Sequence, residues 1–255
     1  KYVGGIVQLD LGYSFRQGAP VIDLIAERLP ATLILTLTAF GISLVCGIAL
    51  GVAAAARVGK PSDSALTTLA LLFYATPLYW AALMAVLVFS VWLGWLPGFG
   101  YETVGANYTG FERVLDILAH LILPALTLGL FFMAVYMRMT RASMLEVSTA
   151  DFVKTAKAKG LSGPVIRRRH ILRNAILPVV TLAGLQAGQL VGGAVLTETV
   201  FAWPGIGRLM FESLAARDYN TILGVFLVSA AMVILFNIVT DIVYRIVDPR
   251  IGARA

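Results

Sequence analysis

The chain has 255 residues, of which 59% are apolar and 13% are charged, and its mean hydropathy is +0.85. This composition excludes an ordinary soluble globular domain and indicates an integral membrane protein. The net charge of +6 does not indicate nucleic-acid binding, because most of the basic residues lie in loops on one side of the predicted membrane spans.

Five apolar runs approach the roughly 20 residues that a helix needs to cross a bilayer. In chain order, the predicted spans lie near residues 31–56, 66–92, 117–137, 174–197 and 219–247. The runs lack the period-two alternation of membrane β-strands, so we expect an all-α polytopic bundle that forms a single transmembrane domain over residues 1–255. Residues 1–30 are too polar for a span, and we expect an external segment that leads into a helix near Leu29 and Pro30. Since the chain begins with Lys1, we also expect a further span before it.

The distribution of Lys and Arg predicts the orientation of these spans. Of the 20 basic residues, fourteen fall on one side of the predicted spans and six on the other. Basic residues are enriched in cytoplasmic loops, so residues 1–30 are expected outside and the carboxyl terminus inside.

A polar and strongly basic stretch, residues 148–173, interrupts the apolar runs on the inner side. Ser148 and Asp151 have the spacing of a capping box, which predicts a helix start. Phe152, Thr155, Ala156 and Lys159 follow the i, i+3, i+4, i+7 pattern, so we expect one face whose small centre lets a partner approach closely. Gly160 is expected to end this helix in the left-handed conformation.

A second short helix is predicted to open at Ser162 and Pro164. We expect Val165, Leu172 and Ala175 to share one side of it. The helix should lie along the membrane, with its arginines in reach of phosphate headgroups: Arg167, Arg168, Arg169 and Arg173. The alternative for the whole stretch is an amphipathic loop that only stabilises the inner surface.

The fourth predicted span carries a stripe of glycines at every fourth position, Gly184, Gly188 and Gly192, which allows close helix contact in lipid. The opposite side is polar and is a candidate lining for a translocation pathway, although its glutamines can equally bond neighbouring helices. At the outer end we expect Glu198 either in the external mouth or in solvent. The candidate pathway residues are Gln186, Gln189, Gly193, Thr197 and Glu198.

The external segment after this span, residues 198–220, contains too many helix-breaking residues for one uninterrupted helix. Trp203, Pro204, Gly205 and Gly207 follow one another closely. We therefore predict a turn followed by a short amphipathic helix over Arg208–Ala216, lying at the outer surface.

Catalytic signatures are absent from the sequence. It contains no glycine-rich phosphate loop and no carboxylate pair at active-site spacing, and its two histidines have no ligands at metal spacing. We expect neither catalytic residues nor a metal or cofactor, so any ATP must be hydrolysed elsewhere.

The chain contains four motifs in order: DFVKTAKAKGLS, HILRNAILPVVT, FAWPGIGRLMFESLAARDYNTILG and NIVTDIVYRIVDPRIG. With these motifs it resembles the membrane subunits of ATP-binding-cassette importers, specifically the oligopeptide and dipeptide permeases. The resemblance implies a type I importer permease fold, with a sixth span before the external segment. It also implies that the first short helix is a coupling helix that fits a cleft on the cytosolic ATPase subunit. The usual Glu-Ala-Ala opening is here Lys154-Thr155-Ala156. The residues implied in coupling are Phe152, Lys154, Thr155, Ala156, Lys157, Ala158, Lys159 and Gly160.

The resemblance also implies the partners and the location. It implies a homologous second permease, two cytosolic ATP-binding subunits and an external solute-binding protein, assembled in the lipid of a bacterial inner membrane, with no nucleic acid. A short peptide is the expected cargo, while glutathione, nickel chelates and sugars stay open. The alternative function is an ion-driven secondary transporter, although the sequence shows neither the internal repeat nor the mid-membrane acidic cluster of that class.

Overall fold

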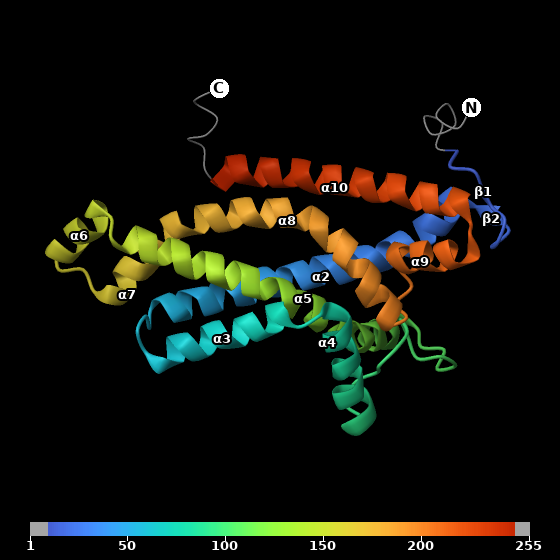
Figure 1. Ribbon diagram of the computed structural model, residues 1–255, viewed down its shortest axis with the longest axis horizontal. Coiled ribbons are helices and arrows are strands. Elements are labelled where there is room, and N and C mark those ends of the chain that lie inside the picture. The colour runs from blue at the N-terminus through green and yellow to red at the C-terminus, as the bar shows by residue number, and fades with distance from the viewer. Residues whose placement is uncertain (1–9, 248–255) are drawn as a thin grey trace. The chain divides into compact units, whose positions relative to one another are not determined.

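The computed structural model describes the backbone of residues 10–247, and the side chains of these residues except 187–193, 240, 241 and 243–247. This part of the chain is mostly helical (Figure 1). The elements in chain order are β1 (Tyr13–Ser14), β2 (Ala19–Pro20), α2 (Val21–Ala55), α3 (Pro61–Ala75), α4 (Leu78–Ala85), the π-helix η1 (Val86–Trp92), α5 (Gly110–Ser148), α6 (Asp151–Ala158), α7 (Gly163–Val165), the π-helix η2 (Ile166–Ile171), α8 (Leu172–Val200), α9 (Ile206–Ala216) and α10 (Tyr219–Val247).

Three helices among the described residues are long and apolar enough to cross a membrane: α2, α5 and residues 219–239 of α10. A fourth candidate arises if the interrupted pair formed by α3 and α4–η1 counts as one span. The predicted all-α membrane architecture is therefore confirmed at this coarser level. Helix α8 covers the fourth predicted span, but the side chains in its middle lie outside the described residues.

One predicted helix start is wrong, and one predicted span is not a single helix. The first helix begins at Val21 rather than near Leu29, so Pro30 lies inside it. The charged residues of its first turns made this part look like loop, although Val21, Leu24 and Ile25 are buried. The predicted span 66–92 is interrupted at Thr76 and Pro77, where ψ is 128° and 129°, because a residue that precedes proline disfavours the α conformation.

The chain divides into two compact units, each built from separate stretches of sequence. The first unit comprises the described parts of residues 1–39, 77–128 and 188–235, and the second comprises those of 40–76, 129–187 and 236–255. Helices α2, α5, α8 and α10 each contribute residues to both units.

In the first unit, the β1–β2 hairpin is attached to the turn between α9 and α10. The Ser14 hydroxyl donates to an Asp218 carboxylate oxygen at 2.5 Å, and the Thr221 hydroxyl donates to the same oxygen at 2.9 Å. Burial alone would raise the pKa of Asp218, but the hydrogen bonds from Ser14 and Thr221 outweigh burial and the pKa lies below its ordinary value. The segment before α2 is therefore held by a buried polar network.

In the second unit, α2 packs on α5 through two glycines one helical turn apart. A Cβ added at Gly47 would meet the Tyr136 side chain and the Met133 carbonyl oxygen, and one added at Gly51 would meet Thr140. Small residues at this spacing let two helix backbones approach closely.

Asp63 and Arg141 form a bidentate ion pair that joins α3 to α5 in the second unit. The Arg141 Nε and Nη2 atoms donate to the two Asp63 carboxylate oxygens at 2.8 and 2.7 Å. The Asp63 side chain is 7% exposed and that of Arg141 is 29% exposed. A two-bond arrangement of this kind fixes geometry better than a single contact.

We expect the Asp63→Asn variant to unfold at a lower temperature than the wild type, because the amide cannot accept both hydrogen bonds and leaves Arg141 without its countercharge. The matched control is Asp151→Asn, which breaks an ion pair whose side chains are 69% and 95% exposed. Exposed pairs contribute about 0–1 kcal/mol, so this control should unfold like the wild type. Thermal unfolding of the purified chain in detergent measures both, and equal loss in the two variants would contradict the structural role of the buried pair.

Candidate functional site

Helix α6 begins at Asp151, two residues later than a cap at Ser148 would place it, and the predicted capping box is not formed. Its N-cap is Ala150, which makes no side-chain capping bond. Ser148 instead ends α5, and its hydroxyl donates to the Leu145 carbonyl at 2.7 Å. The preceding helix continues to Ser148, so this hydroxyl has an acceptor within its own helix and is not available to α6.

The inner face of α6 consists of Val153 and Ala156, which are 0% and 4% exposed. These two side chains belong to a cluster that draws on α5, η2 and α8: Met144, Val153, Ala156, Ile166, Ile171 and Ala175. The prediction that Ala156 lies on the face presented to a partner is therefore wrong. Its small side chain permits close packing of α6 onto the chain's own helices.

The outer face of α6 carries Phe152, Thr155 and Lys159, and all three side chains are exposed. Their spacing of three and four residues places them on one side of the helix. Phe152 is 44% exposed although it is a large aromatic residue. Lys154, Lys157 and Ala158 are also exposed, and Lys154 Nζ donates to an Asp151 carboxylate oxygen at 2.8 Å. The structure thus separates an anchored inner face from an open outer one.

Gly160 ends α6 in the left-handed conformation that was predicted, with a φ of 76°. The Gly160 N–H donates to the Lys157 carbonyl at 3.0 Å, and the Leu161 N–H donates to the Ala156 carbonyl at 3.3 Å. These two bonds make a Schellman motif, which satisfies carbonyls at the helix end and reverses the chain direction. The exit from α6 therefore depends on a backbone conformation that glycine adopts without strain.

The second predicted helix starts where expected, with Ser162 as N-cap and a proline in the first turn. It is not a separate surface helix, because α7 continues through η2 into α8 without a break. The prediction that Val165 shares a side with Leu172 and Ala175 is wrong, since Val165 is 39% exposed while Ala175 is buried and Leu172 packs against the same cluster. In η2 the buried side chains are Ile166 and Ile171, which lie five residues apart, the hydrogen-bond spacing of a π-turn.

The candidate pathway residues of α8 fall into three groups. The side chains of Gln189 and Gly193 lie outside the described residues. Gln186 is partly buried, and its side-chain oxygen has no hydrogen-bond partner among the described residues. Thr197 and Glu198 are each 0% exposed, so neither side chain faces an open pathway in this conformation.

Glu198 is neither solvated nor in an open mouth, and that prediction is wrong. Its carboxyl group accepts from the Thr32 hydroxyl at 2.6 Å and from the Arg208 N–H at 3.0 Å, and it also interacts with the Gly207 N–H. The Thr32 oxygen accepts from the Ile206 N–H at 2.8 Å. Two side chains from α2 and α8 thus cap the first turn of α9, whose amides have no partners within the helix.

The residues around this cap pack tightly against it. Trp203 is completely buried and its indole N–H donates to the Ala31 carbonyl at 2.9 Å. A Cβ added at Gly205 would collide with the Glu198 carboxyl group, and one added at Gly207 would meet the Val195 backbone. From the sequence these glycines were expected only to break a helix. The predicted short helix is confirmed as α9, which spans Ile206–Ala216 and begins two residues before the predicted Arg208.

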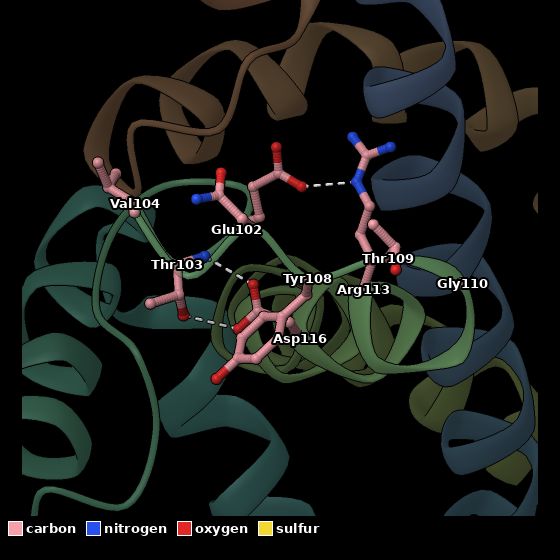
Figure 2. Close-up of a pocket in the computed structure, with 10 residues that line it drawn as sticks. Glu102, Thr103, Val104, Tyr108, Thr109, Gly110, Arg113 and Asp116 are labelled. Atoms are coloured by element: carbon pink, nitrogen blue, oxygen red, sulfur yellow. Dashed lines mark hydrogen bonds and ion pairs between the residues drawn. The ribbon is translucent and has the colours of Figure 1, made fainter.

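A hollow of about 680 Å³ in the first unit, beside the start of α5, was not predicted. Figure 2 shows that Arg113 and Glu102 pair with each other and that Asp116 is bonded to Thr103. The Thr103 N–H and hydroxyl donate to the two Asp116 carboxylate oxygens at 2.6 and 2.7 Å, and the Arg113 Nε donates to Glu102 at 2.7 Å. No three His, Cys, Asp or Glu residues of the described part of the chain are grouped to hold a metal ion.

The family model for "Binding-protein-dependent transport system inner membrane component" matches residues 47–253. The chain belongs to this family. As a binding-protein-dependent transport component, it is a transport subunit of the inner membrane and not an enzyme. This confirms the resemblance to importer permeases.

Two curated relatives of this transport component are similar over nearly all of the chain. It is 41% identical over 252 residues to the oligopeptide transport system permease protein AppB of Bacillus subtilis (strain 168), covering 98% of this chain and 78% of that protein. It is 40% identical over 267 residues to the dipeptide transport system permease protein DppB of Escherichia coli (strain K12), covering 98% and 79%. A solved structure of the MetNI methionine ABC transporter in an inward facing conformation has a TM-score of 0.70 at 18% identity, over 88% of this chain and 96% of that one. This last likeness supports the fold alone.

Proposed function

We propose that the chain is the permease subunit of an ATP-driven importer of short peptides and that α6 is its coupling helix. The observation that carries the proposal is the division of α6 into two faces. Val153 and Ala156 anchor the helix to α5, η2 and α8, while Phe152, Thr155 and Lys159 stay open. A helix that is fixed on one side and open on the other can pass a displacement to the spans behind it. The peptide cargo is proposed from the names of the two relatives above.

In the proposed mechanism, a pair of separate cytosolic ATPase subunits binds the outer face of α6. When nucleotide binding brings the two ATPase subunits together, they move α6. The movement reaches α5 through Met144 and α8 through Ala175, because both side chains pack in the same cluster as α6. The spans then open alternately outward, toward a loaded external binding protein, and inward. A second homologous permease completes the pathway, with Gln186, Gln189 and Gly193 as its candidate lining on α8.

The proposed topology places residues 148–173 and the carboxyl terminus in the cytoplasm. It treats α2, the α3 to η1 segment, α5, α8 and α10 as five spans. The excess of Lys and Arg on this side supports the orientation.

The proposal is tested with the chain co-expressed with a second permease, ATPase subunits and a binding protein, and reconstituted in vesicles. Uptake of a labelled dipeptide or tripeptide should require ATP and the binding protein. Uptake that runs without ATP and follows an imposed ion gradient would instead support a secondary transporter and overturn the proposal.

We expect Phe152→Ala to weaken co-purification of the ATPase subunit on the order of tenfold, since exposed aromatic side chains often dominate the binding energy of an interface. The matched control is Phe111→Ala, which removes another exposed phenylalanine, 75% exposed, from the start of α5. Pull-down with tagged permease measures both variants. Full retention of the ATPase by Phe152→Ala would exclude this face as the docking surface.

A further inference from the structure

Three arginines line one hollow at the junction of α7, η2 and α8. This hollow, called here the arginine pocket, has a volume of about 700 Å³ and is lined by Pro164, Val165, Arg168, Arg169 and Arg173. All five residues are exposed, and Val165 gives the pocket an apolar edge that is 39% exposed.

The π-helical conformation of η2 brings these arginines together. In a regular α-helix of 3.6 residues per turn, side chains five positions apart point in clearly different directions. A π-turn makes hydrogen bonds between residues five apart, as in the bond from the Leu172 N–H to the Arg167 carbonyl. Arg168 and Arg173 are five apart, so the π-turn moves them toward one side of the helix. The pocket is therefore a product of the local backbone and not only of a basic sequence run.

Within the part of the chain that the structure describes, no carboxylate forms an ion pair with an arginine of the arginine pocket. None of the pocket's lining residues is acidic. Clustered guanidinium groups without countercharges repel one another and favour a bound anion. Phosphate suits them, because a planar guanidinium can donate two parallel hydrogen bonds to it.

We propose that the arginine pocket binds the phosphate headgroup of an anionic membrane lipid. The helix that carries the pocket runs directly into α8, the fourth predicted span, and in the proposed topology this end meets the cytoplasmic leaflet. That leaflet presents anionic headgroups to basic residues next to a span, and the apolar edge at Val165 can contact an acyl chain. A protein partner is less well matched, because the aromatic residue that would anchor it, Phe152, lies on α6 and does not line the pocket.

The test measures lipid retained by the full chain and does not require transport, so its failure is distinguishable from failure of the proposed function. The chain is reconstituted in vesicles of phosphatidylcholine mixed with phosphatidylglycerol, extracted in mild detergent and examined by native mass spectrometry. We expect selective retention of phosphatidylglycerol, reduced on the order of tenfold in the R168Q/R173Q variant. The matched control, R57Q/K60Q, removes two exposed charges from the loop after α2 and should retain lipid like the wild type.

Three outcomes would overturn the proposal. Equal loss in both double variants would show a general effect of charge. Displacement of the retained lipid by inorganic phosphate would identify a site for free phosphate. Unchanged lipid retention in R168Q/R173Q, with loss of the ATPase subunit on co-purification, would assign the pocket to protein docking.

Discussion

The Gly205→Ala variant is expected to lose roughly 3 kcal/mol of stability, the upper range for overpacking a well-packed site. The added methyl group would occupy the space of the Glu198 carboxyl group, which is itself completely buried. The carboxyl group cannot move aside without abandoning the Thr32 hydroxyl and the Arg208 N–H. Thermal unfolding of the purified chain in detergent measures the loss.

Gly41→Ala is the matched control for this prediction. Gly41 lies inside α2, is exposed, and has nothing within 4 Å of an added Cβ. Alanine in a helix interior is favoured over glycine by about 0.5–1 kcal/mol, so this variant should be as stable as the wild type or more so. A double-mutant cycle adds the decisive comparison: in a Glu198→Ala background the Gly205→Ala change should cost much less. An equal cost in both backgrounds would show that the collision with Glu198 is not the cause.

The Gly160→Val variant is expected to lower ATP-dependent uptake roughly tenfold while ATP hydrolysis continues. Valine in the left-handed region is disfavoured by about 1–2 kcal/mol, so the Schellman bonds at the end of α6 weaken and the outer face loses its fixed orientation. The strain should stay local to the end of α6 and leave membrane insertion intact, because nothing lies within 4 Å of an added Cβ at Gly160.

Gly160→Asn is the control for this variant, since asparagine tolerates the left-handed conformation and should retain most of the uptake. Parallel assays of peptide uptake and ATP hydrolysis in reconstituted vesicles separate coupling from activity. Wild-type uptake by Gly160→Val would contradict the role of α6 as a rigid coupling element.

The sequence predicted those features that depend on local backbone preference or on gross hydropathy. Gly160 was predicted to be left-handed because few residues other than glycine adopt this conformation readily, and α9 was predicted because its breakers precede an amphipathic run. The apolar character of α2, α5 and α10 was evident from composition along the chain.

The features that the sequence did not reveal depend on contacts between distant residues. Ala156 fitted an open face by periodicity, but Ile166 and Ile171 from the following segment cover it. Glu198 looked like a terminal charge next to solvent, and only the return of α9 onto α2 and α8 buries it. The π-turns of η2 have no simple sequence signature, so the exposure of Val165 and the burial of Ile166 and Ile171 were not predicted.

The cap on α9 also constrains how the chain matures. Thr32 and Ile206, which it joins, are 174 positions apart, so during synthesis the threonine leaves the ribosome long before its partner exists. Until Gly205 and its neighbours leave the ribosome, the Thr32 hydroxyl and the Glu198 carboxyl group cannot accept hydrogen bonds from the N–H groups of α9. Closure of this corner is therefore a late step of biogenesis, because it cannot precede the synthesis of α9.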